Sequence, residues 1–176
     1  MDRIESAVRH YKREHLPNLK RLLEWYSSMA SLSDAIINAA MGKDERGKRH
    51  PHQRRLREMN LVTARRRLLG LKEQVRQCTS FEELLDLVEA ITDRIHGLGE
   101  LYAYDTALRI GAYLGLLPEK VYLHAGTRVG AQALGFDTKA RSIQLQSLPQ
   151  PFHSLEPHEA EDVLCIYKDQ FKRNSV

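Results

Sequence analysis

The chain has 176 residues, 42% of them hydrophobic, and a net charge of +4. This length suits one domain with a sizeable core, and no run of about 18 apolar residues indicates a transmembrane helix. The N-terminus lacks the apolar core of a secretory signal. Two cysteines, Cys78 and Cys165, are too few for a four-thiolate iron–sulfur site, and a single disulfide between them stays open. We expect a cytoplasmic protein with no membrane association and no cofactor.

The basic residues are concentrated in one segment. Residues 42–68 contain ten Lys or Arg against three Asp or Glu, for a net charge of +7, whereas residues 80–176 have a net charge of −5. Such a concentration of positive charge attracts polyanions. The alternative is a solvated loop followed by the polar face of a helix. The side chains that we expect to contact phosphates are Arg46, Lys48, Arg49, Arg54, Arg55 and Arg57.

The N-terminal part of the chain predicts helices. Apolar residues recur at helical spacing over residues 3–28, where Pro17 should kink the helix or begin a new one. The stretch Ser31-Leu32-Ser33-Asp34 contains candidate N-caps for a short helix through Ala39 or Met41. The remaining predictions here are a loop over residues 42–51 and one long amphipathic helix over residues 54–77.

Two further helix patterns flank a glycine-rich turn. Ser80 and Glu83 form a capping box before a helix expected over residues 81–95, and a second helix is expected over residues 101–114. Between them, Gly97-Leu98-Gly99 permits a positive φ and lets another backbone approach closely. Outward-facing N–H groups in such a turn can bind a phosphate. We expect this role for Gly97 and Gly99; the alternative is a turn that only joins two packed helices.

The C-terminal part also predicts mainly helices. Residues 118–135 indicate one helix, or two short ones meeting near Gly126, and residues 142–146 are candidates for extended structure. Pro157 should open a last helix that ends near Phe171. Because the alternation typical of a sheet is missing, the sequence predicts an all-α protein of six to eight helices.

Residues 81–135 resemble the helix-hairpin-helix DNA glycosylase superfamily, typified by endonuclease III. The similar features are a helix, the Gly97-Leu98-Gly99 turn, a second helix ending near Gly115, and then Val121-Tyr122-Leu123-His124-Ala125-Gly126-Thr127-Arg128-Val129. Family members have V-D-T-H-x-x-R-V in the last segment, so one extra residue separates His124 from Arg128 here. The resemblance covers under a third of the chain and implies a hairpin whose amides bind a DNA phosphate.

The catalytic positions of that family are occupied by other residues in this chain. Tyr122 stands where the family has its catalytic aspartate, and Leu101 stands where some members have a Schiff-base lysine. Leucine has no nucleophile, and a phenol substitutes poorly for a carboxylate beside a developing cation. Glu100 would also repel a phosphate at the hairpin. We therefore expect no glycosylase or lyase activity by the family mechanism, and whether the chain is an enzyme stays open.

A second group of polar residues is a candidate pocket: Asp105, Tyr122, His124 and Arg128. A buried Asp105 needs a partner, such as Arg128 or a helix N-terminus, because an unpaired buried carboxylate is costly. The alternative is an acid–base or ligand-orienting group in a pocket. His50 and His52 have no third ligand near them in the sequence, so we assign no metal site.

The fold class we expect is an all-α orthogonal helical bundle containing a helix-hairpin-helix unit. It would form a single domain over residues 1–176, with N-terminal helices and the basic segment in 1–79, the hairpin region in 80–135, and an irregular segment with the last helix in 136–176. The favoured function is a non-catalytic, sequence-nonspecific module that binds the DNA or RNA backbone. The alternatives are an enzyme of unassigned chemistry with a pocket around Asp105, Tyr122 and His124, and a helical protein-interaction or dimerisation module, for which a homo-oligomer is one option.

Overall fold

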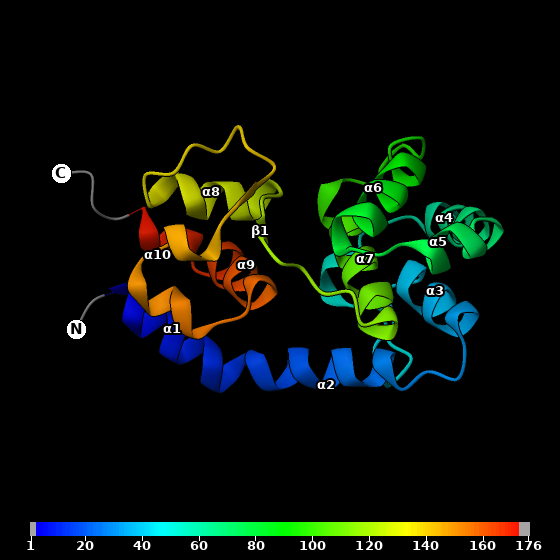
Figure 1. The fold of residues 1–176 in the computed structure, drawn as a ribbon, viewed down its shortest axis with the longest axis horizontal. Coiled ribbons are helices and arrows are strands. Elements are labelled where there is room, and N and C mark those ends of the chain that lie inside the picture. Colours follow the sequence, from blue (N-terminus) through cyan, green and yellow to red (C-terminus); the bar gives the residue numbers. More distant parts are fainter. Residues whose placement is uncertain (1–2, 173–176) are drawn as a thin grey trace. The chain divides into compact units, whose positions relative to one another are not determined.

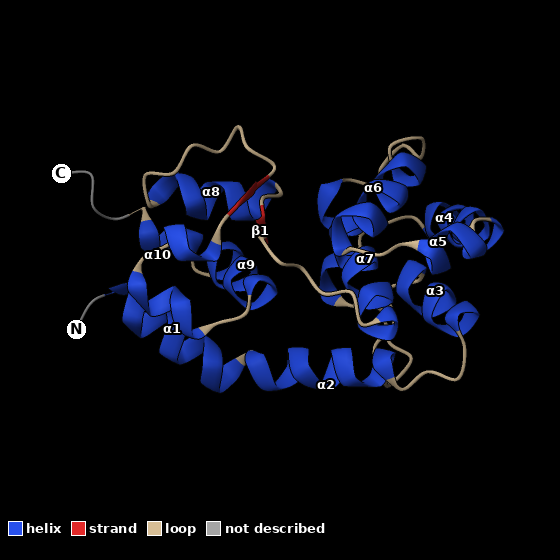
Figure 2. Cartoon of the chain, in the orientation of Figure 1, coloured by secondary structure: helices blue, strands red, loops and turns tan. Residues whose placement is uncertain are grey.

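The computed structural model describes residues 3–172. These residues form ten α-helices and one two-stranded antiparallel sheet (Figures 1 and 2). The predicted all-α class is therefore confirmed, but the predicted count of six to eight helices is too low. Within residues 3–172, no helix combines the length and apolar character needed to cross a bilayer.

The chain folds as two compact units. Residues 20–117 form one, called here the central unit, and the terminal unit combines the residues up to 19 with those from 118 onward. The boundary near residue 19 lies inside helix α2 (Leu16–Ser27). The single domain expected from the sequence stays a prediction, because a compact unit is not by itself shown to fold alone.

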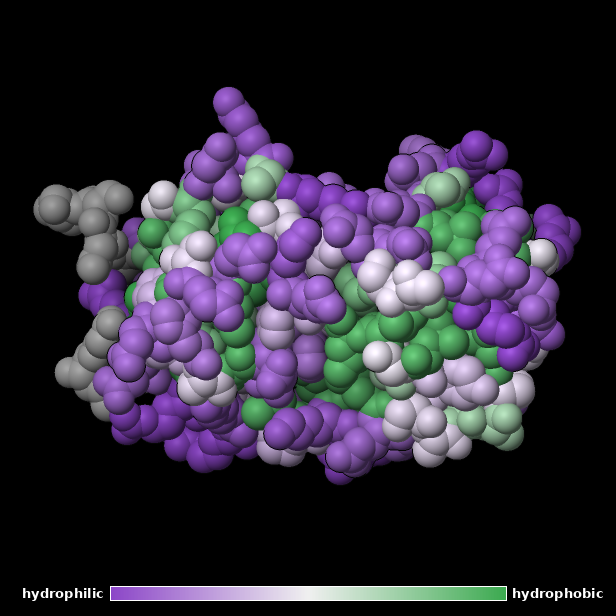
Figure 3. Space-filling model, viewed as in Figure 1, coloured by the Kyte–Doolittle hydropathy of each residue, from purple (hydrophilic) through white to green (hydrophobic). Residues whose placement is uncertain are grey.

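The central unit is built around one almost completely buried helix. Its helices are α3 (Leu32–Ala40), α4 (Glu58–Gly70), α5 (Lys72–Gln77), α6 (Phe81–Thr92) and α7 (Glu100–Leu114), with a 3₁₀ turn η1 (Pro51–Gln53). Helix α7 packs against both α3 and α6, and the Tyr102 hydroxyl donates a hydrogen bond to the Ala40 carbonyl over 2.8 Å. In the view of Figure 3, apolar residues gather over α7, while hydrophilic residues cover much of the remaining face. The core of this unit therefore forms around α7.

Local signals in the sequence set several helix ends. The Ser31 and Ser80 hydroxyls accept hydrogen bonds from the Asp34 and Glu83 amides, as expected of N-caps. Gly115 ends α7 with a left-handed φ of 73°, which glycine adopts at little cost. Helix α6 ends at Thr92, three residues before the end predicted for it at residue 95.

The prediction of one long helix over residues 54–77 is wrong. The chain instead forms α4 and α5, which are separated at Leu71, directly after Gly70. Glycine is a poor helix former, so a break there costs little. Residues 54–57 lie outside the helix, and Arg57 is extended, with φ −66° and ψ 131°.

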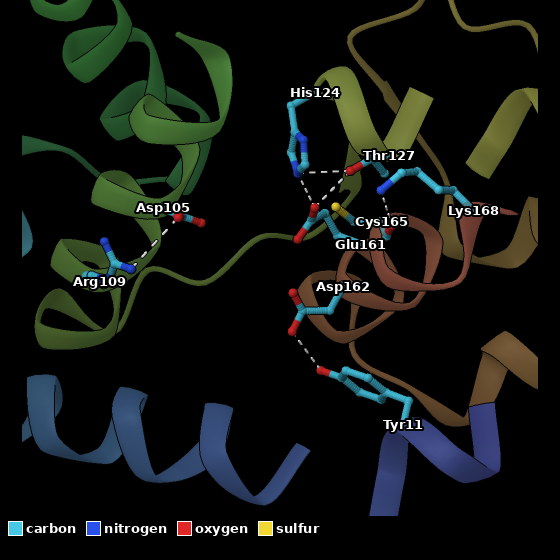
Figure 4. Close-up of polar contacts among 9 residues, drawn as sticks. All are labelled: Tyr11, Asp105, Arg109, His124, Thr127, Glu161, Asp162, Cys165 and Lys168. Carbon is cyan, nitrogen blue, oxygen red and sulfur yellow. Dashed lines mark hydrogen bonds and ion pairs between the residues drawn. The ribbon is translucent and has the colours of Figure 1, made fainter. Parts of the chain in front are cut away.

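The terminal unit packs its helices around an apolar core and the small sheet. Its elements are α1 (Arg3–Glu14), β1 (Val121–Tyr122), α8 (Ala125–Ala133), β2 (Ser142–Ile143), the 3₁₀ turns η2 (Leu145–Ser147) and η3 (Gln150–Ser154), α9 (Pro157–Ile166) and α10 (Lys168–Phe171). Helices α8 and α9 pack closely, and α9 also contacts α1, α10 and β1. The Tyr11 hydroxyl donates a 3.0 Å hydrogen bond to Asp162 and so joins α1 to α9 (Figure 4).

Two predictions for this unit need correction. Residues 121–122 form strand β1, not a helix, and pair with Ser142 and Ile143, within the segment expected to be extended. The last predicted helix is divided at Tyr167 into α9 and α10. The apolar run Val121-Tyr122-Leu123 is fully buried, and a short buried strand has no periodicity that distinguishes it from a helix turn.

Candidate functional site

The first part of the positively charged stretch 42–68 is a structured loop of the central unit. This loop, residues 42–57, is called the basic segment from here on. The Tyr26 hydroxyl donates to the Lys43 carbonyl over 2.7 Å, and Lys43 pairs with Arg49 in an isolated antiparallel bridge. Asp44 Oδ1 accepts hydrogen bonds from the amides of Arg46 (3.0 Å) and Lys48 (2.8 Å). These contacts fix the backbone, so the basic side chains extend from a defined surface.

Gln53 anchors the second half of the basic segment. Its side chain is only 1% exposed and lies against Gly42, where an added Cβ would be 1.5 Å from Gln53 Oε1. Gly42 has a φ of 63°, so both its conformation and its missing side chain are needed here. The packing of these two residues holds η1 against the body of the unit.

Most of the cations predicted to contact phosphates face solvent. Arg49 is half-buried and donates to the Leu56 carbonyl over 3.4 Å, while Arg54 donates to the Arg49 carbonyl over 3.3 Å. Arg46 lies 3.9 Å from Glu45, a pair too exposed to hold it strongly. The exposed members of the predicted set are Arg46, Lys48, Arg54, Arg55 and Arg57.

The glycine turn, Gly97-Leu98-Gly99, is connected to the start of α4 by a hydrogen bond next to it in the chain. The Asn60 side-chain amide, in the first turn of α4, donates a 2.8 Å hydrogen bond to the His96 carbonyl. The next residue, Gly97, has a φ of 92°, and a Cβ there would lie 3.1 Å from Asn60 Nδ2. Because α4 directly follows the basic segment, this bond brings the 93–99 connection beside the end of that segment.

Gly99 is the N-cap of the fifteen-residue helix α7. It is exposed and extended, with φ −109° and ψ −175°, and a Cβ added to it would meet nothing within 4 Å. The first amides of a helix point outward without intrahelical partners and attract anions. Glu100 follows in the first turn and is exposed, so it adds a negative charge at this helix end.

Asp105 lies in a polar cluster within the central unit. Its carboxylate is 3.8 Å from the Arg109 guanidinium, one turn later on α7, and accepts a 3.4 Å hydrogen bond from Gln53 (Figure 4 shows the ion pair). Arg109 is therefore a partner of this carboxylate within the central unit, and the pair with Arg128 suggested by the sequence stays a prediction. Burial, assisted by the nearby Arg109 cation, lowers the pKa of His50 to about 4. His50 is thus neutral at physiological pH and adds no charge to the basic segment.

A second polar cluster lies in the terminal unit, between α8 and α9. His124, the N-cap of α8, is 3% exposed and forms a hydrogen-bonded pair with Glu161, which is 4% exposed. Thr127 Oγ1 lies 2.9 Å from His124 Nε2 and donates to Glu161 Oε1 over 2.8 Å. The Cys165 thiol, one turn after Glu161, completes the group (Figure 4).

The other two candidate pocket residues have structural contacts. Tyr122 is buried on β1, with the Arg141 guanidinium 5.7 Å from its ring centroid. Arg128 donates to the carbonyls of Thr138 (3.3 Å) and Ala140 (3.4 Å) and so supports the loop after α8. Tyr122, His124 and Arg128 belong to the terminal unit and Asp105 to the central unit, so a shared pocket stays a prediction.

Sequence reasoning missed the partners that complete both clusters. The sequence assigned no role to Gln53, Asn60 or Arg109. Gln53 is a polar residue among basic ones, where a buried side chain is not expected, so its position in the sequence did not indicate its contacts. Glu161 and Cys165 are 37 and 41 positions after His124, too far apart for a ligand-spacing motif. One signal was available: they are four residues apart, which places them on the same face of a helix.

Comparison with known proteins adds no further assignment. No protein-family model matches the chain, and no curated protein or solved structure gives a significant match.

Proposed function

We propose that the central unit binds the phosphate backbone of nucleic acids without reading their sequence. The main support is the Asn60–His96 hydrogen bond, because it joins the glycine turn to the helix that follows the basic segment. A phosphate-binding turn and a cluster of cations within one unit can contact successive phosphates of one strand. Phosphate contacts position a protein on a duplex but contain no base information, so binding should be sequence-independent.

The basic segment and the glycine turn would contribute different interactions with the phosphate backbone. The exposed arginines and lysine of the basic segment would provide long-range attraction through counterion release. The amides after Gly99 would provide short, directed hydrogen bonds to a phosphate oxygen. The resemblance of residues 81–135 in sequence to helix-hairpin-helix glycosylases supports the same assignment.

The proposal is for binding only. Leu101, in the first turn of α7, has no amine with which to form a Schiff base. We therefore expect that borohydride treatment of the chain with abasic-site DNA traps no covalent complex. A trapped complex would overturn the non-catalytic part of the proposal.

The decisive experiment measures the affinity of the full chain for labelled duplexes of unrelated sequence by fluorescence anisotropy. Replacing Arg54, Arg55 and Arg57 by alanine should weaken binding by roughly tenfold or more for every sequence and reduce the salt slope by about 3. The matched control replaces Arg9, Lys12 and Arg13 by alanine, removing the same charge from the exposed face of α1. Absence of binding at low salt, or an equal loss in the control, would refute the proposal.

Two further variants test the glycine turn itself. Gly99→Ala adds a methyl group into open space at an extended φ, so it should fold normally. If a phosphate approaches the amides closely, this methyl group will weaken binding. Glu100→Gln should strengthen binding by a few-fold, because it removes a negative charge beside the same phosphate. Binding that responds to the arginines but to neither variant would restrict the interface to the basic segment.

A further inference from the structure

Three metal-ligating side chains converge inside the terminal unit. A ring nitrogen of His124, a carboxylate oxygen of Glu161 and the Cys165 sulfur all lie within 4.8 Å of one another. They come from the start of α8 and from successive turns of α9, and Figure 4 shows them directed toward one point. His124 and Glu161 are almost fully buried, and Cys165 is half-buried. Such a set differs from the exposed acidic groups that gather on many protein surfaces.

Gly126 keeps the space beside the thiol open. A Cβ added at this position would lie 2.6 Å from the Cys165 sulfur and 3.9 Å from His124 Cε1. Any other residue here would force the Cys165 side chain to shift from this position. The glycine therefore preserves room for the thiol and the imidazole to face one another.

The hydrogen atoms of the cluster are too few for its contacts. Glu161 Oε1, Thr127 Oγ1 and His124 Nε2 are all in mutual contact. An ionised carboxylate has no hydrogen to donate, so the Thr127 hydroxyl and one imidazole N–H must serve three contacts. A cation at this point would be bound by the lone pairs of the nitrogen and the carboxylate oxygen, and the Thr127 hydroxyl would still donate to the carboxylate.

We propose that His124, Glu161 and Cys165 bind one divalent transition-metal ion of the zinc class. Nitrogen, sulfur and carboxylate oxygen are the ligands that zinc accepts in proteins, whereas magnesium and calcium require oxygen ligands. Thr127 would act from outside the coordination sphere by donating to the Glu161 carboxylate. Binding displaces the thiol proton to solvent, so the affinity rises with pH. This inference does not depend on nucleic-acid binding by the central unit.

The other candidate group, His50, His52 and Asp105, is a poorer site for a cation. Its ligand atoms also lie within 4.8 Å of one another, but His52 is exposed. The Arg109 guanidinium is 3.8 Å from the Asp105 carboxylate and would repel a metal ion. This group therefore provides an internal comparison with similar residue types and an unfavourable charge.

The test uses the full chain after chelator treatment, titrated with cobalt(II) and then with zinc. We expect one ion per chain, a sulfur-to-cobalt charge-transfer absorption that zinc abolishes, and a zinc dissociation constant of about 1 µM or tighter. Cys165→Ser, Glu161→Gln and Gly126→Ala should each weaken zinc binding at least tenfold. Cys78→Ser, and His50→Gln with His52→Gln, are the matched controls and should leave the affinity unchanged.

Alkylation of the unmutated chain gives a result even if a variant fails to fold. Zinc should slow the modification of Cys165 by iodoacetamide, measured by mass spectrometry, and leave that of Cys78 unchanged. Equal rates with and without zinc, or an absence of cobalt absorption, would overturn the proposal. So would a zinc affinity that survives both Cys165→Ser and Glu161→Gln in folded protein.

Discussion

Replacing Gly130 with alanine should destabilise the protein, because the added methyl group forces α8 and α9 apart. These two helices hold the second polar cluster. Gly130 lies inside α8, and a Cβ built on it would be 2.1 Å from the Leu164 carbonyl oxygen and 2.8 Å from its carbon. Both atoms belong to the backbone of α9, so no side-chain rotation can relieve the overlap. The helices must separate locally by about 1 Å to restore ordinary contact distances.

The expected cost follows from two opposing effects. A gap of that size removes a quarter to a half of the dispersion energy of the affected contacts, and overpacking of this kind typically costs about 1–3 kcal/mol. Alanine recovers up to about 1 kcal/mol because it favours the helix over glycine. At a clash this severe, we expect a net loss of about 2 kcal/mol, equivalent to a fall in Tm of roughly 4–8 °C for a chain of this size.

Gly70→Ala is the matched control. Gly70 is the last residue of α4, is exposed, and an added Cβ would meet nothing within 4 Å outside its own helix backbone and its two chain neighbours. The same chemical change should therefore stabilise the protein by about 0.5–1 kcal/mol. Urea unfolding followed by circular dichroism measures both variants. A Gly130→Ala variant as stable as Gly70→Ala would refute the close contact between α8 and α9.

Two other predictions concern the central unit. The pKa of His50 is lowered from its usual 6.5 to about 4, chiefly by burial, with Arg109 and His52 lowering it further and Asp105 and Asp44 opposing this effect. The unfolded chain therefore binds a proton at His50 more readily than the folded chain, and the free energy of unfolding falls as the pH falls from 6.5 toward 4. Because His50 is only half-buried, we expect this loss to be about 1 kcal/mol. Urea unfolding across this pH range measures it, and the His50→Gln variant should not show it. Ser80→Ala should cost about 1 kcal/mol by removing the N-cap of α6, measurable at neutral pH, and an unchanged unfolding midpoint would show that the Glu83 amide needs no cap.

Helix ends marked by a local chemical signal could be predicted from the sequence, and helix interruptions could not. The N-cap serines and the left-handed Gly115 act within one turn of their own backbone, so their identity is sufficient. The strand at Val121, by contrast, depends on a partner distant in sequence. For the strand, the partner is Ile143, and nothing near Val121 indicates that pairing.

The candidate sites show the same dependence on distance along the chain. Asp105 was singled out as a buried carboxylate that needs a partner, and Arg109 lies one turn away on the same helix. Its second partner, Gln53, is 52 positions earlier and becomes recognisable only once η1 is seen to pack beside α7. His124 was likewise identified without Glu161 and Cys165, because a helix face reveals its neighbours only after a second helix is placed against it.

The distribution of charge along the chain also differs from its distribution in the fold. The sequence places the glycine turn in an acidic half, with −5 over residues 80–176, which argues against phosphate binding there. In the structure, that turn belongs to the same unit as the basic segment, and residues 20–117 together contain 16 basic and 13 acidic side chains. A phosphate responds to charges within about 10 Å, the screening length at moderate salt, and not to sequence neighbours. The hydrogen bond from Asn60 to His96 is therefore more informative about this surface than the net charge of either half.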